Sequence, residues 1–272
     1  MNQRIFALCM IALLLSSCNL PSTAVPVSPT ETPIVLPTNT TSAGSTVTLN
    51  NVSLSLPLGV ANGAESEVVP ASAPDTPPWE NAPAHLRFQL TGYQLQNNFF
   101  EPQVFVYPTD EYAQMYPTAG DQIQRLKAIL AGGVLSKDTM PMIPFFNAAQ
   151  IFASQMQVID FKSGRGVRML TQYDQYPAPV NNHELFYHFQ GLTNDGKYYI
   201  IAILPATSSI LAANETPESP VPAGGVAIPP ATGPDPAYYE AVTKALDAMY
   251  PDSFNPSLFQ LDALIQSITV TP

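Results

Sequence analysis

The sequence predicts an α+β fold, an antiparallel β-sheet with helices packed on it, preceded by a disordered tether. Residues 149–205 hold long aromatic and β-branched stretches separated by short turn signals, which is typical of antiparallel hairpins. Apolar residues recur at helical spacing in residues 121–133 and again after residue 235. Residues 18–46 are rich in Pro, Ser and Thr and offer little from which to build a core. These patterns predict a single domain at residues 47–272.

The first part of the domain is expected to hold a strand, a long loop and two more strands. The first strand is TVTLNNVSLSLP, which Pro57 ends. Six prolines in residues 57–84 predict a loop, with Trp79, the only tryptophan, holding it to the core. In HLRFQLTGYQL apolar and polar residues alternate, and PQVFVYP predicts a short strand between two prolines.

Two helical segments are expected next. Thr109 is positioned to cap a short helical turn, DEYAQMY. Thr118 and Asp121 have the spacing of a capping box ahead of QIQRLKAILAGG, and Gly132-Gly133 should end that helix. Its apolar face is expected to comprise Ile123, Leu126, Ile129 and Leu130.

The middle of the chain predicts two hairpins. SQMQVIDFKSGRGVRMLTQY should turn at Ser163-Gly164, and NHELFYHFQGLTNDGKYYIIAIL at Asn194-Asp195-Gly196. The segment YYIIAIL is apolar on both faces, so we expect it at the centre of the sheet.

The last part of the chain predicts a second proline-rich insertion and two helices. Residues 205–236 contain eight prolines and few charges. Asp235 and Pro236 then suit the N-cap and first position of a helix, and Asn255-Pro256 repeats that signal. The inward faces are expected to be Tyr238, Val242, Leu246 and Met249, and then Leu258, Leu261, Leu264, Ile265 and Ile268.

The amino terminus predicts export. Arg4 precedes an uncharged apolar run, and the run ends in Leu15-Ser16-Ser17-Cys18, which resembles the bacterial lipobox. We therefore expect a signal peptide at residues 1–17 and lipid on Cys18. The alternative is an ordinary secretory signal with an incidental cysteine. Cys9 lies within the predicted leader, so Cys18 would be the only thiol of the mature chain, which favours the lipoprotein.

The predicted tether at residues 18–46 is interrupted by five prolines and carries one charge, Glu31. This composition favours extended polyproline II, which at about 3.1 Å per residue would reach roughly 80 Å. Its expected role is to hold the domain away from the membrane to which the lipid binds. The Ser and Thr content leaves open whether the tether is glycosylated.

Two resemblances extend this interpretation. The opening strand that ends in Pro57, the aromatic meander and the closing helix LDALIQSITV resemble the PsbP-like α/β fold over residues 47–272. FNAAQIFASQMQVIDFKSGRGVRMLTQYDQ, together with NNHELFYHFQGLTNDGKYYI, is similar to uncharacterised lipoproteins of Chloroflexi-type filamentous bacteria. Neither resemblance implies a catalytic residue.

The charge balance excludes some partners. The chain has 10 basic and 21 acidic residues, and loss of Arg4 with the leader would leave a net charge of −12. Nucleic acid requires a basic footprint, so we expect no nucleic-acid partner. Peripheral binding to anionic lipid is disfavoured for the same reason.

The chain shows none of the common nucleophile, zinc or phosphate motifs, and no catalytic, cofactor-binding or metal-ligating residue is predicted. The Gly164-Arg165-Gly166 stretch is expected to belong to a hairpin turn. His183 and His188 are five apart on a strand-like segment, which suits hydrogen-bonded sheet residues better than joint metal ligands.

Two further sets of residues are expected to be structural. Asp160, Asp174 and Glu184 should be solvated or paired with Lys162, Arg165 and Arg168 rather than form an acid–base pair. The aromatic residues are expected to pack in the core rather than form an exposed platform: Tyr173, Tyr176, Phe186, Tyr187, Phe189, Tyr198 and Tyr199.

The sequence thus predicts a lipoprotein anchored to a cell membrane or outer envelope through Cys18 and facing away from the cytoplasm. Its expected function is non-catalytic: binding of a protein or small-molecule ligand, or structural support of the envelope. The alternative is an envelope hydrolase with an unrecognised active site. In a binding module the two proline-rich insertions should lie beside an apolar groove, whereas in an enzyme they should cover a pocket with converging polar groups.

Overall fold

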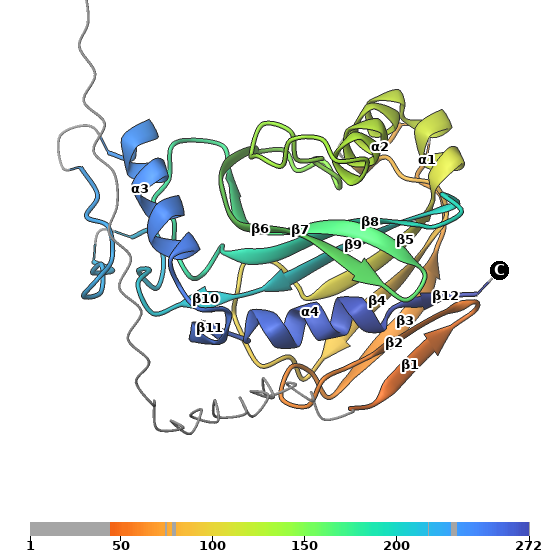
Figure 1. The fold of residues 1–272 in the computed structure, drawn as a ribbon, viewed down its shortest axis with the longest axis horizontal. Helices are drawn as coiled ribbons and strands as arrows, with labels where there is room; N and C mark the ends of the chain where they lie inside the picture. Colours follow the sequence, from red (N-terminus) through yellow and green to blue (C-terminus); the bar gives the residue numbers. More distant parts are fainter. Residues whose placement is uncertain (1–43, 74, 78–79, 217, 230–232, 272) are drawn as a thin grey trace, which may run out of the picture. The chain divides into compact units, whose positions relative to one another are not determined.

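The computed structural model describes residues 44–73, 75–77, 80–216, 218–229 and 233–271. The predicted leader, Cys18, residues 18–43 of the predicted tether and Trp79 lie outside the described residues. From Gly44 onward the described chain is an α+β unit, which confirms the predicted fold class (Figure 1). No helix in this described part is both long and apolar enough to cross a bilayer.

A seven-stranded antiparallel sheet forms the centre of the domain. Its strands are β3 (Gly63–Val69), β4 (His85–Thr91), β5 (Gln103–Pro108), β6 (Ala149–Phe161), β7 (Gly164–Asp174), β8 (Phe186–Thr193) and β9 (Tyr198–Pro205). They lie in the order β3-β4-β5-β9-β8-β7-β6, so β9 is central and β3 and β6 form the edges. The central place predicted for YYIIAIL is therefore confirmed.

Apolar side chains alternate between the two faces of the sheet and build a separate core on each. On β9 the alternation is complete: Ile200, Ala202 and Leu204 join one core, and Tyr199, Ile201 and Ile203 join the other. Helices and a smaller sheet cover both faces, which is why the central strands need no polar side.

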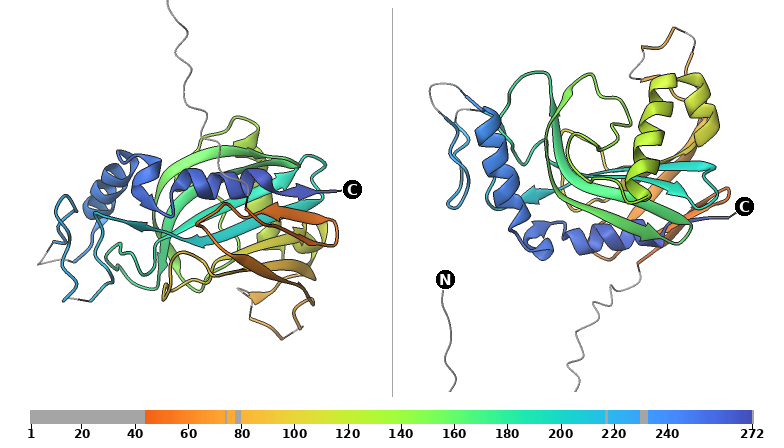
Figure 2. Two further views of the ribbon diagram at one scale, coloured as in Figure 1. Left: turned by 90° about the horizontal axis from the view of Figure 1, so that it is seen from below. Right: turned by 45° about the horizontal axis from the view of Figure 1, so that its top comes forward.

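One face is covered by α1 (Thr109–Met115), α2 (Pro117–Leu130) and the loop at residues 131–148 (Figures 1 and 2). The other face is covered by α3, α4 and a three-stranded sheet of β1, β2 and β12. Their bounds are α3 (Pro236–Asp247), α4 (Leu258–Ser267), β1 (Thr46–Leu49), β2 (Val52–Ser55) and β12 (Thr269–Val270). Between α3 and α4 the chain forms the 3-10 turn η2 (Pro251–Ser253) and β11 (Phe254–Asn255), which pairs with β10 (Thr207–Ser208).

The helices after residue 235 follow the predicted pattern. The Asp235 side chain accepts a hydrogen bond of 2.8 Å from the backbone N–H of Tyr238, and Pro236 occupies the first turn. Tyr238, Val242 and Leu246 are buried, as are all five apolar residues predicted for the second helix, whereas Met249, predicted for the face of the first, lies beyond the end of α3 and is partly buried. The predicted hairpins β6–β7 and β8–β9 also form, although the first turns at Lys162-Ser163, one residue earlier than expected.

Two strand predictions are wrong. The single strand expected at residues 46–57 is the hairpin β1–β2, because Asn50 adopts a φ of 51° and reverses the chain. The loop expected at residues 57–84 contains the edge strand β3. In its sequence GAESEVV no residue is buried, which fits an edge strand that has a neighbour on one side only.

Three predicted helix caps are also wrong. Neither Thr109 nor Thr118 caps a helix: α1 begins at Thr109 itself, and α2 begins at Pro117 without a side-chain cap. Proline suits the first helical position because it lacks an N–H that would otherwise need a partner. Asn255 does not cap α4 either, because it pairs with Thr207 in the β10–β11 ladder.

Candidate functional site

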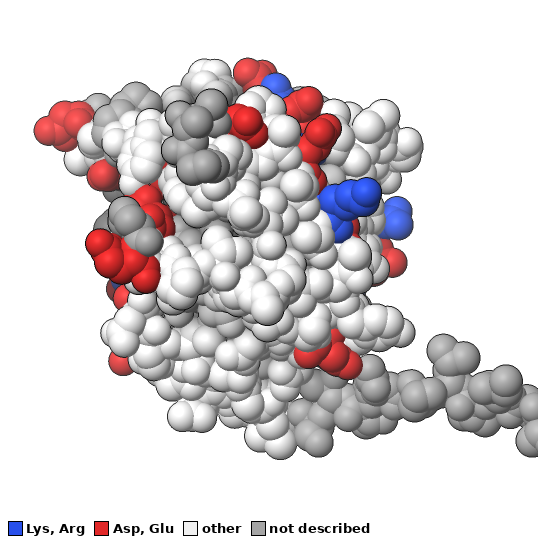
Figure 3. Space-filling model, turned by 90° about the vertical axis from the view of Figure 1, so that its left-hand side faces the viewer, with Lys and Arg blue, Asp and Glu red and all other residues white. Residues whose placement is uncertain are grey.

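One end of the large sheet gathers several long connections of the domain. β7 ends there and β8 begins there, and the loops at 92–102, 131–148 and 206–235 lie around these strand ends (Figure 1). Seen from that side, most of the surface is uncharged, and acidic side chains surround it (Figure 3). This end carries two features that sequence reasoning did not identify: an apolar groove and a cluster of carboxylates.

The groove follows the open edge of β6 and has a volume of about 400 Å³. Its floor consists of strand residues, and its walls come from α3 on one side and from the loop at 131–148 on the other. The strand residues are Ile151, Phe152, Ala153 and Met156. The α3 residues are Pro236, Tyr239, Glu240 and Thr243, and the loop residue is Lys137.

The groove wraps around the strand edge rather than lying on one face of the sheet. Phe152 belongs to the core beneath α3 and α4, whereas Ala153 belongs to the core beneath α1 and α2. β6 is the last strand of its sheet and pairs only with β7 among the strands of the described chain. Phe152 and Ala153 are nevertheless only 1% and 3% exposed, so the groove leaves little of the strand itself open to solvent.

Buried polar contacts hold the loop wall in place. Gln190 on β8 accepts a hydrogen bond of 3.1 Å from the N–H of Ile143 and donates one of 2.5 Å to the carbonyl of Pro141. His188 Nε2 lies 3.0 Å from the carbonyl oxygen of Ile143. These contacts fix the inner part of the loop to the sheet.

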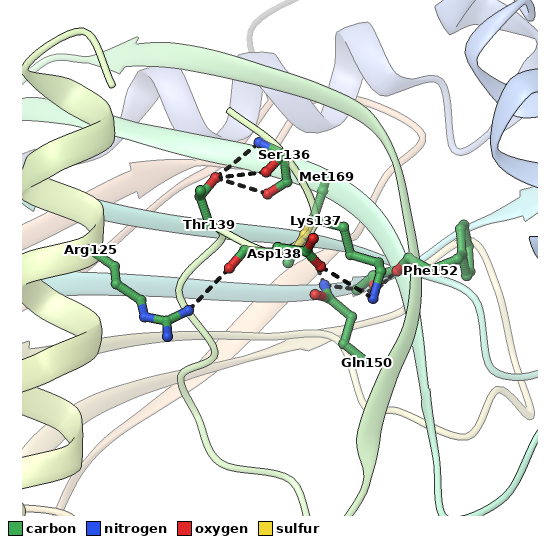
Figure 4. A network of polar contacts seen from close by, with 9 residues as sticks. Arg125, Ser136, Lys137, Asp138, Thr139, Gln150, Phe152 and Met169 are labelled. Carbon is green, nitrogen blue, oxygen red and sulfur yellow. Dashed lines mark hydrogen bonds and ion pairs between the residues drawn. The ribbon is translucent and has the colours of Figure 1, made fainter. Parts of the chain in front are cut away.

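The outer part of the same loop is a tight turn. Thr139 Oγ1 accepts a hydrogen bond of 3.0 Å from the N–H of Ser136, and Arg125 of α2 donates one of 3.2 Å to the carbonyl of Asp138. In Figure 4, Lys137 extends from this turn toward Phe152 of β6. Its ammonium group lies 3.8 Å from Asp138 Oδ1, so a neighbouring carboxylate offsets its charge.

The α3 wall is fastened to a bulge in β6. Gln155 adopts a φ of 51° where the pairing with β7 is irregular. Its N–H donates a hydrogen bond of 2.5 Å to Asp247 Oδ1, and its side-chain amide donates to the carbonyl of Leu246 at 2.8 Å. The end of α3 is thereby held beside β6, and the groove lies between this attachment and the start of the strand.

The carboxylate cluster consists of Asp174, Glu184 and Glu215, whose nearest oxygens lie within 4.8 Å of one another. Asp174 ends β7, Glu184 precedes β8, and Glu215 comes from the second proline-rich insertion. The buried amide of Gln172 joins the first two: its Nε2 donates to Asp174 Oδ2 at 2.7 Å and to Glu184 Oε2 at 2.8 Å.

Two further contacts complete the cluster. The Asn181 amide donates a hydrogen bond of 2.7 Å to Glu184 Oε2. The Tyr176 hydroxyl donates one of 2.5 Å to Glu215 Oε2 and so ties the insertion to the end of β7. Each carboxylate thus has a hydrogen-bond donor, yet none of the three forms an ion pair with a Lys or Arg of the described chain.

The surroundings of Asp174 and Glu184 raise the pKa of both carboxyl groups. Burial raises the pKa of Asp174 to about 6, against the opposing hydrogen bond from Gln172, and the charges of Glu184 and Glu215 raise it further. Burial also raises the pKa of Glu184, and its hydrogen bond from Asn181 opposes that rise. Oxygen donors of this kind are those that hard divalent cations prefer, so these three residues are the ones in the described chain that lie close enough to share such an ion.

The expectation for the acidic residues is confirmed at one position and wrong at two. Asp160 pairs with Arg165, whose Nε lies 2.8 Å from Asp160 Oδ1. Asp174 and Glu184 gather with each other instead of with bases, because the β7–β8 pairing and the shared amide of Gln172 bring them together. Arg168 is buried and pairs with Asp262 of α4.

The histidines are not brought together as ligands. His188 is buried in β8, and burial lowers its pKa to about 3, so its ring is neutral. His183 is exposed and lies before β8 rather than on it, with Nδ1 at 2.9 Å from the carbonyl of Asn97. The prediction that His188 is a hydrogen-bonded sheet residue is confirmed.

Five of the seven aromatic residues expected in the core are buried, as predicted: Tyr173, Phe186, Tyr187, Phe189 and Tyr199. Tyr198 is partly buried, and Tyr176 is 55% exposed and contacts the carboxylate cluster. Gly166 sits where a Cβ would lie 2.4 Å from the Gln190 carbonyl oxygen, so it serves the packing of β7 against β8.

Comparison of the chain with known protein families and with characterised protein sequences finds no match. The function is therefore inferred from the residues and geometry above.

Proposed function

We propose that the protein is a lipid-anchored, extracytoplasmic binding module whose ligand occupies the groove along β6. In this proposal Cys18 carries the lipid, the proline-rich segment sets the distance from the membrane, and the domain binds without catalysis. The resemblance to the PsbP-like fold remains a prediction about the fold and contributes no residue to the proposed site.

The observation that supports binding is the groove itself. Ligand sites are usually concave, largely apolar and partly bounded by a few polar groups, and volumes of several hundred Å³ are typical. The groove has this size, with four strand residues as its floor and Lys137 and Glu240 at its rim. Its walls are held by contacts to Gln190 and Gln155, so the site exists before any ligand arrives.

The carboxylate cluster favours the second candidate, an envelope hydrolase. Neighbouring carboxylates with unequal pKa values are typical of acid–base catalysis. However, five recesses of the described residues, the groove among them, are lined by other side chains than Asp174, Glu184 and Glu215. Release of soluble sugar or peptide from isolated envelope by the wild type, abolished in Asp174→Asn, would favour the hydrolase.

The binding proposal is tested by retention of envelope components on the immobilised full chain. Thr243→Trp places an indole in the groove from α3, and Ala241→Trp places the same group on the exposed side of that helix. We expect a component retained by the wild type and by Ala241→Trp to be lost with Thr243→Trp. Equal retention by all three proteins would contradict the proposal.

The anchor is tested separately by growing cells with radiolabelled fatty acid. We expect label on the wild type and none on Cys18→Ala, because the thiol is the expected acceptor. Two or more acyl chains hold a protein stably, since each buried methylene contributes about 0.8 kcal/mol. Absence of label on the wild type would contradict the lipoprotein assignment.

A further inference from the structure

We propose that the domain has a second binding site, a pocket formed by the loop between β4 and β5 that holds one neutral sugar ring of an envelope glycan. The pocket is lined by residues of the segment 90–102 and by Pro205 at the end of β9. It shares no lining residue with the β6 groove, so the two sites can be tested separately. Export of the chain, as proposed above, would bring the pocket to such glycans.

The size and the inner lining of the pocket suit a single sugar ring. Its volume is about 260 Å³, slightly below the range of roughly 300–1,000 Å³ that is usual for drug-sized ligands. Most of the inner lining is apolar: Leu90, Tyr93, Leu95, Phe100, Pro102 and Pro205. The two faces of a sugar ring present C–H groups, so a ring can cover this apolar surface and remove it from water.

The outer lining offers side-chain amides with free hydrogen-bonding groups. Among the described residues, the exposed side chain of Asn97 makes no hydrogen bond. Gln96 Nε2 donates a hydrogen bond of 2.6 Å to the carbonyl of Tyr93, and Gln96 Oε1 accepts none there. Asn98 Nδ2 donates one of 3.0 Å to the carbonyl of Asn182, and Asn98 Oδ1 likewise accepts none. Amides and sugar hydroxyls both donate and accept, so this rim complements the hydroxyl groups at the edge of a ring.

An exposed aromatic ring stands beside the pocket. Phe99 is 61% exposed, and its ring meets that of Phe100, a lining residue, edge to face at 4.9 Å between centroids. The face of an aromatic ring carries partial negative charge, which attracts the C–H groups of a sugar. Phe99 is therefore placed to contact the next ring of a glycan whose first ring occupies the pocket.

The charge of the lining selects against acidic ligands. Glu101 is the one carboxylate of the lining, and no Lys or Arg of the described chain lines the pocket. A uronic acid or a phosphate would meet a like charge without a compensating base, which disfavours its binding. A neutral sugar has no such cost, and its hydroxyl groups can donate to the Glu101 carboxylate.

Hydrogen bonds to other elements fix the shape of the pocket. The buried hydroxyl of Tyr93 donates a hydrogen bond of 2.8 Å to the carbonyl of Pro205. The N–H of Phe99 donates one of 2.8 Å to the carbonyl of His183, and His183 Nδ1 lies 2.9 Å from the carbonyl oxygen of Asn97. The loop is thus held in place before a ligand arrives, which lowers the entropy lost on binding.

The test is saturation-transfer NMR on the full-length chain in detergent, with chitohexaose and cellohexaose as neutral probes. Hexagalacturonate serves as the acidic comparison, and hexaglycine offers amides without a sugar ring. Hydrogen exchange of the bound complex reports where the probe lies.

Two variants alter the pocket, and each has a matched control. Asn97→Gly removes the amide and keeps the backbone, because Asn97 has a φ of 61° that glycine adopts readily. Its control is Asn50→Gly, the same change at an exposed residue with a φ of 51° in the β1–β2 turn. Phe99→Ala removes the exposed ring, and its control is Tyr250→Ala, which removes a ring that is 76% exposed beyond the end of α3.

We expect saturable binding of at least one neutral hexasaccharide and slowed amide exchange in residues 92–102. Asn97→Gly and Phe99→Ala should each weaken binding about fivefold or more, while both controls stay within about twofold of the wild type. Thr243→Trp, which fills the β6 groove, should bind the sugar as the wild type does. Hexagalacturonate and hexaglycine should not bind.

Four results would overturn this assignment of the pocket. Absence of binding by both neutral probes would reject it, as would equal weakening by the pocket variants and their controls. Equal binding of hexaglycine would reassign the pocket to peptides, and tighter binding of hexagalacturonate would reject the selection against acids. Loss of sugar binding with intact groove-dependent retention of an envelope component would leave the proposed function standing.

Discussion

Asp174 is a carboxyl group whose surroundings resist its negative charge. It is only 8% exposed, and Glu184 and Glu215 lie beside it. Its pKa rises from 3.8 to about 6, chiefly through burial. Because the folded chain then holds this proton more tightly than the unfolded chain, the carboxyl destabilises the fold above about pH 6. The free energy of unfolding therefore recovers as the pH falls from about 6 toward 4 and the carboxyl takes up its proton.

We therefore predict that Asp174→Asn stabilises the protein at pH 7.5. The expected gain in unfolding free energy is about 1–2 kcal/mol after allowance for solvent screening. The substituted amide oxygen can still accept the hydrogen bond from Gln172. Urea unfolding between pH 5 and 8 checks this, with Asp160→Asn, a solvated carboxylate at the opposite end of the β6–β7 hairpin, as the control. A variant that is less stable than the wild type at pH 7.5 would show that the charge is stabilising.

Arg168 is a buried charge that connects its own strand, β7, to α4 and to β6. Its Nε lies 3.4 Å from Asp262 Oδ1 of α4, and that oxygen accepts a hydrogen bond of 2.8 Å from Tyr187. Its Nη1 donates to the carbonyl of Gln155 at the β6 bulge. Burial raises the pKa of Asp262, and the charge of Arg168 opposes that rise. The pair thus connects α4 to the residue that fastens α3.

Replacing Arg168 alone should lower the free energy of unfolding more than replacing Arg168 and Asp262 together. We expect Arg168→Met to lower the unfolding free energy by about 3–5 kcal/mol, because it leaves the Asp262 carboxylate buried without its cation. The double variant Arg168→Met with Asp262→Leu should recover most of this loss, as can be measured by urea unfolding. If the double variant is as unstable as the single one, the loss comes from packing and not from the unpaired charge.

At the scale of elements, α3 determines whether the groove has two walls. Asp235 caps this helix through the N–H of Tyr238. We predict that Asp235→Ala lowers stability by about 1 kcal/mol and speeds amide exchange in the first turns of α3. Hydrogen exchange checks this, with Glu218→Ala as a control outside the helix. Unchanged exchange in α3 would mean that its contacts with β6, and not its cap, hold it in place.

Elements with strong local signals are predictable from sequence. Asp235-Pro236 marks the start of α3, and the apolar run of β9 indicates its central position. β3 is not predictable in this way, because Glu65 and Glu67 on an edge strand without buried residues weaken the apolar pattern that marks a strand. The caps expected at Thr109 and Thr118 fail because a proline at or beside the first turn starts each helix instead.

At the scale of the whole molecule, the candidate site depends on distant segments. The groove brings together Lys137, Ile151 and Tyr239, which are far apart in the sequence. They meet because β6 is the last strand of the sheet and α3 lies beside it. Asp174, Glu184 and Glu215 likewise meet through strand pairing and one buried amide. Neither set has a local pattern. The one residue of the sequence that marks the cluster is Gln172, two residues before Asp174, whose side-chain amide is buried and hydrogen-bonded to both Asp174 and Glu184.

The chain as a whole is acidic, with a formal net charge of −11. The ion pairs of the described residues use few of its 21 acidic residues, so much of the surface charge is free to attract basic partners. If Cys18 is lipidated, this charge and the groove would be presented near an envelope surface.

The most direct test of the account is site-specific photocrosslinking in the producing cells. A benzoylphenylalanine replaces Met156 in the groove or, as a control, Phe259, which is 38% exposed on α4. We predict an adduct with an envelope component at position 156 and none at position 259. Adducts of equal yield at both positions, or no adduct at position 156, would contradict the account.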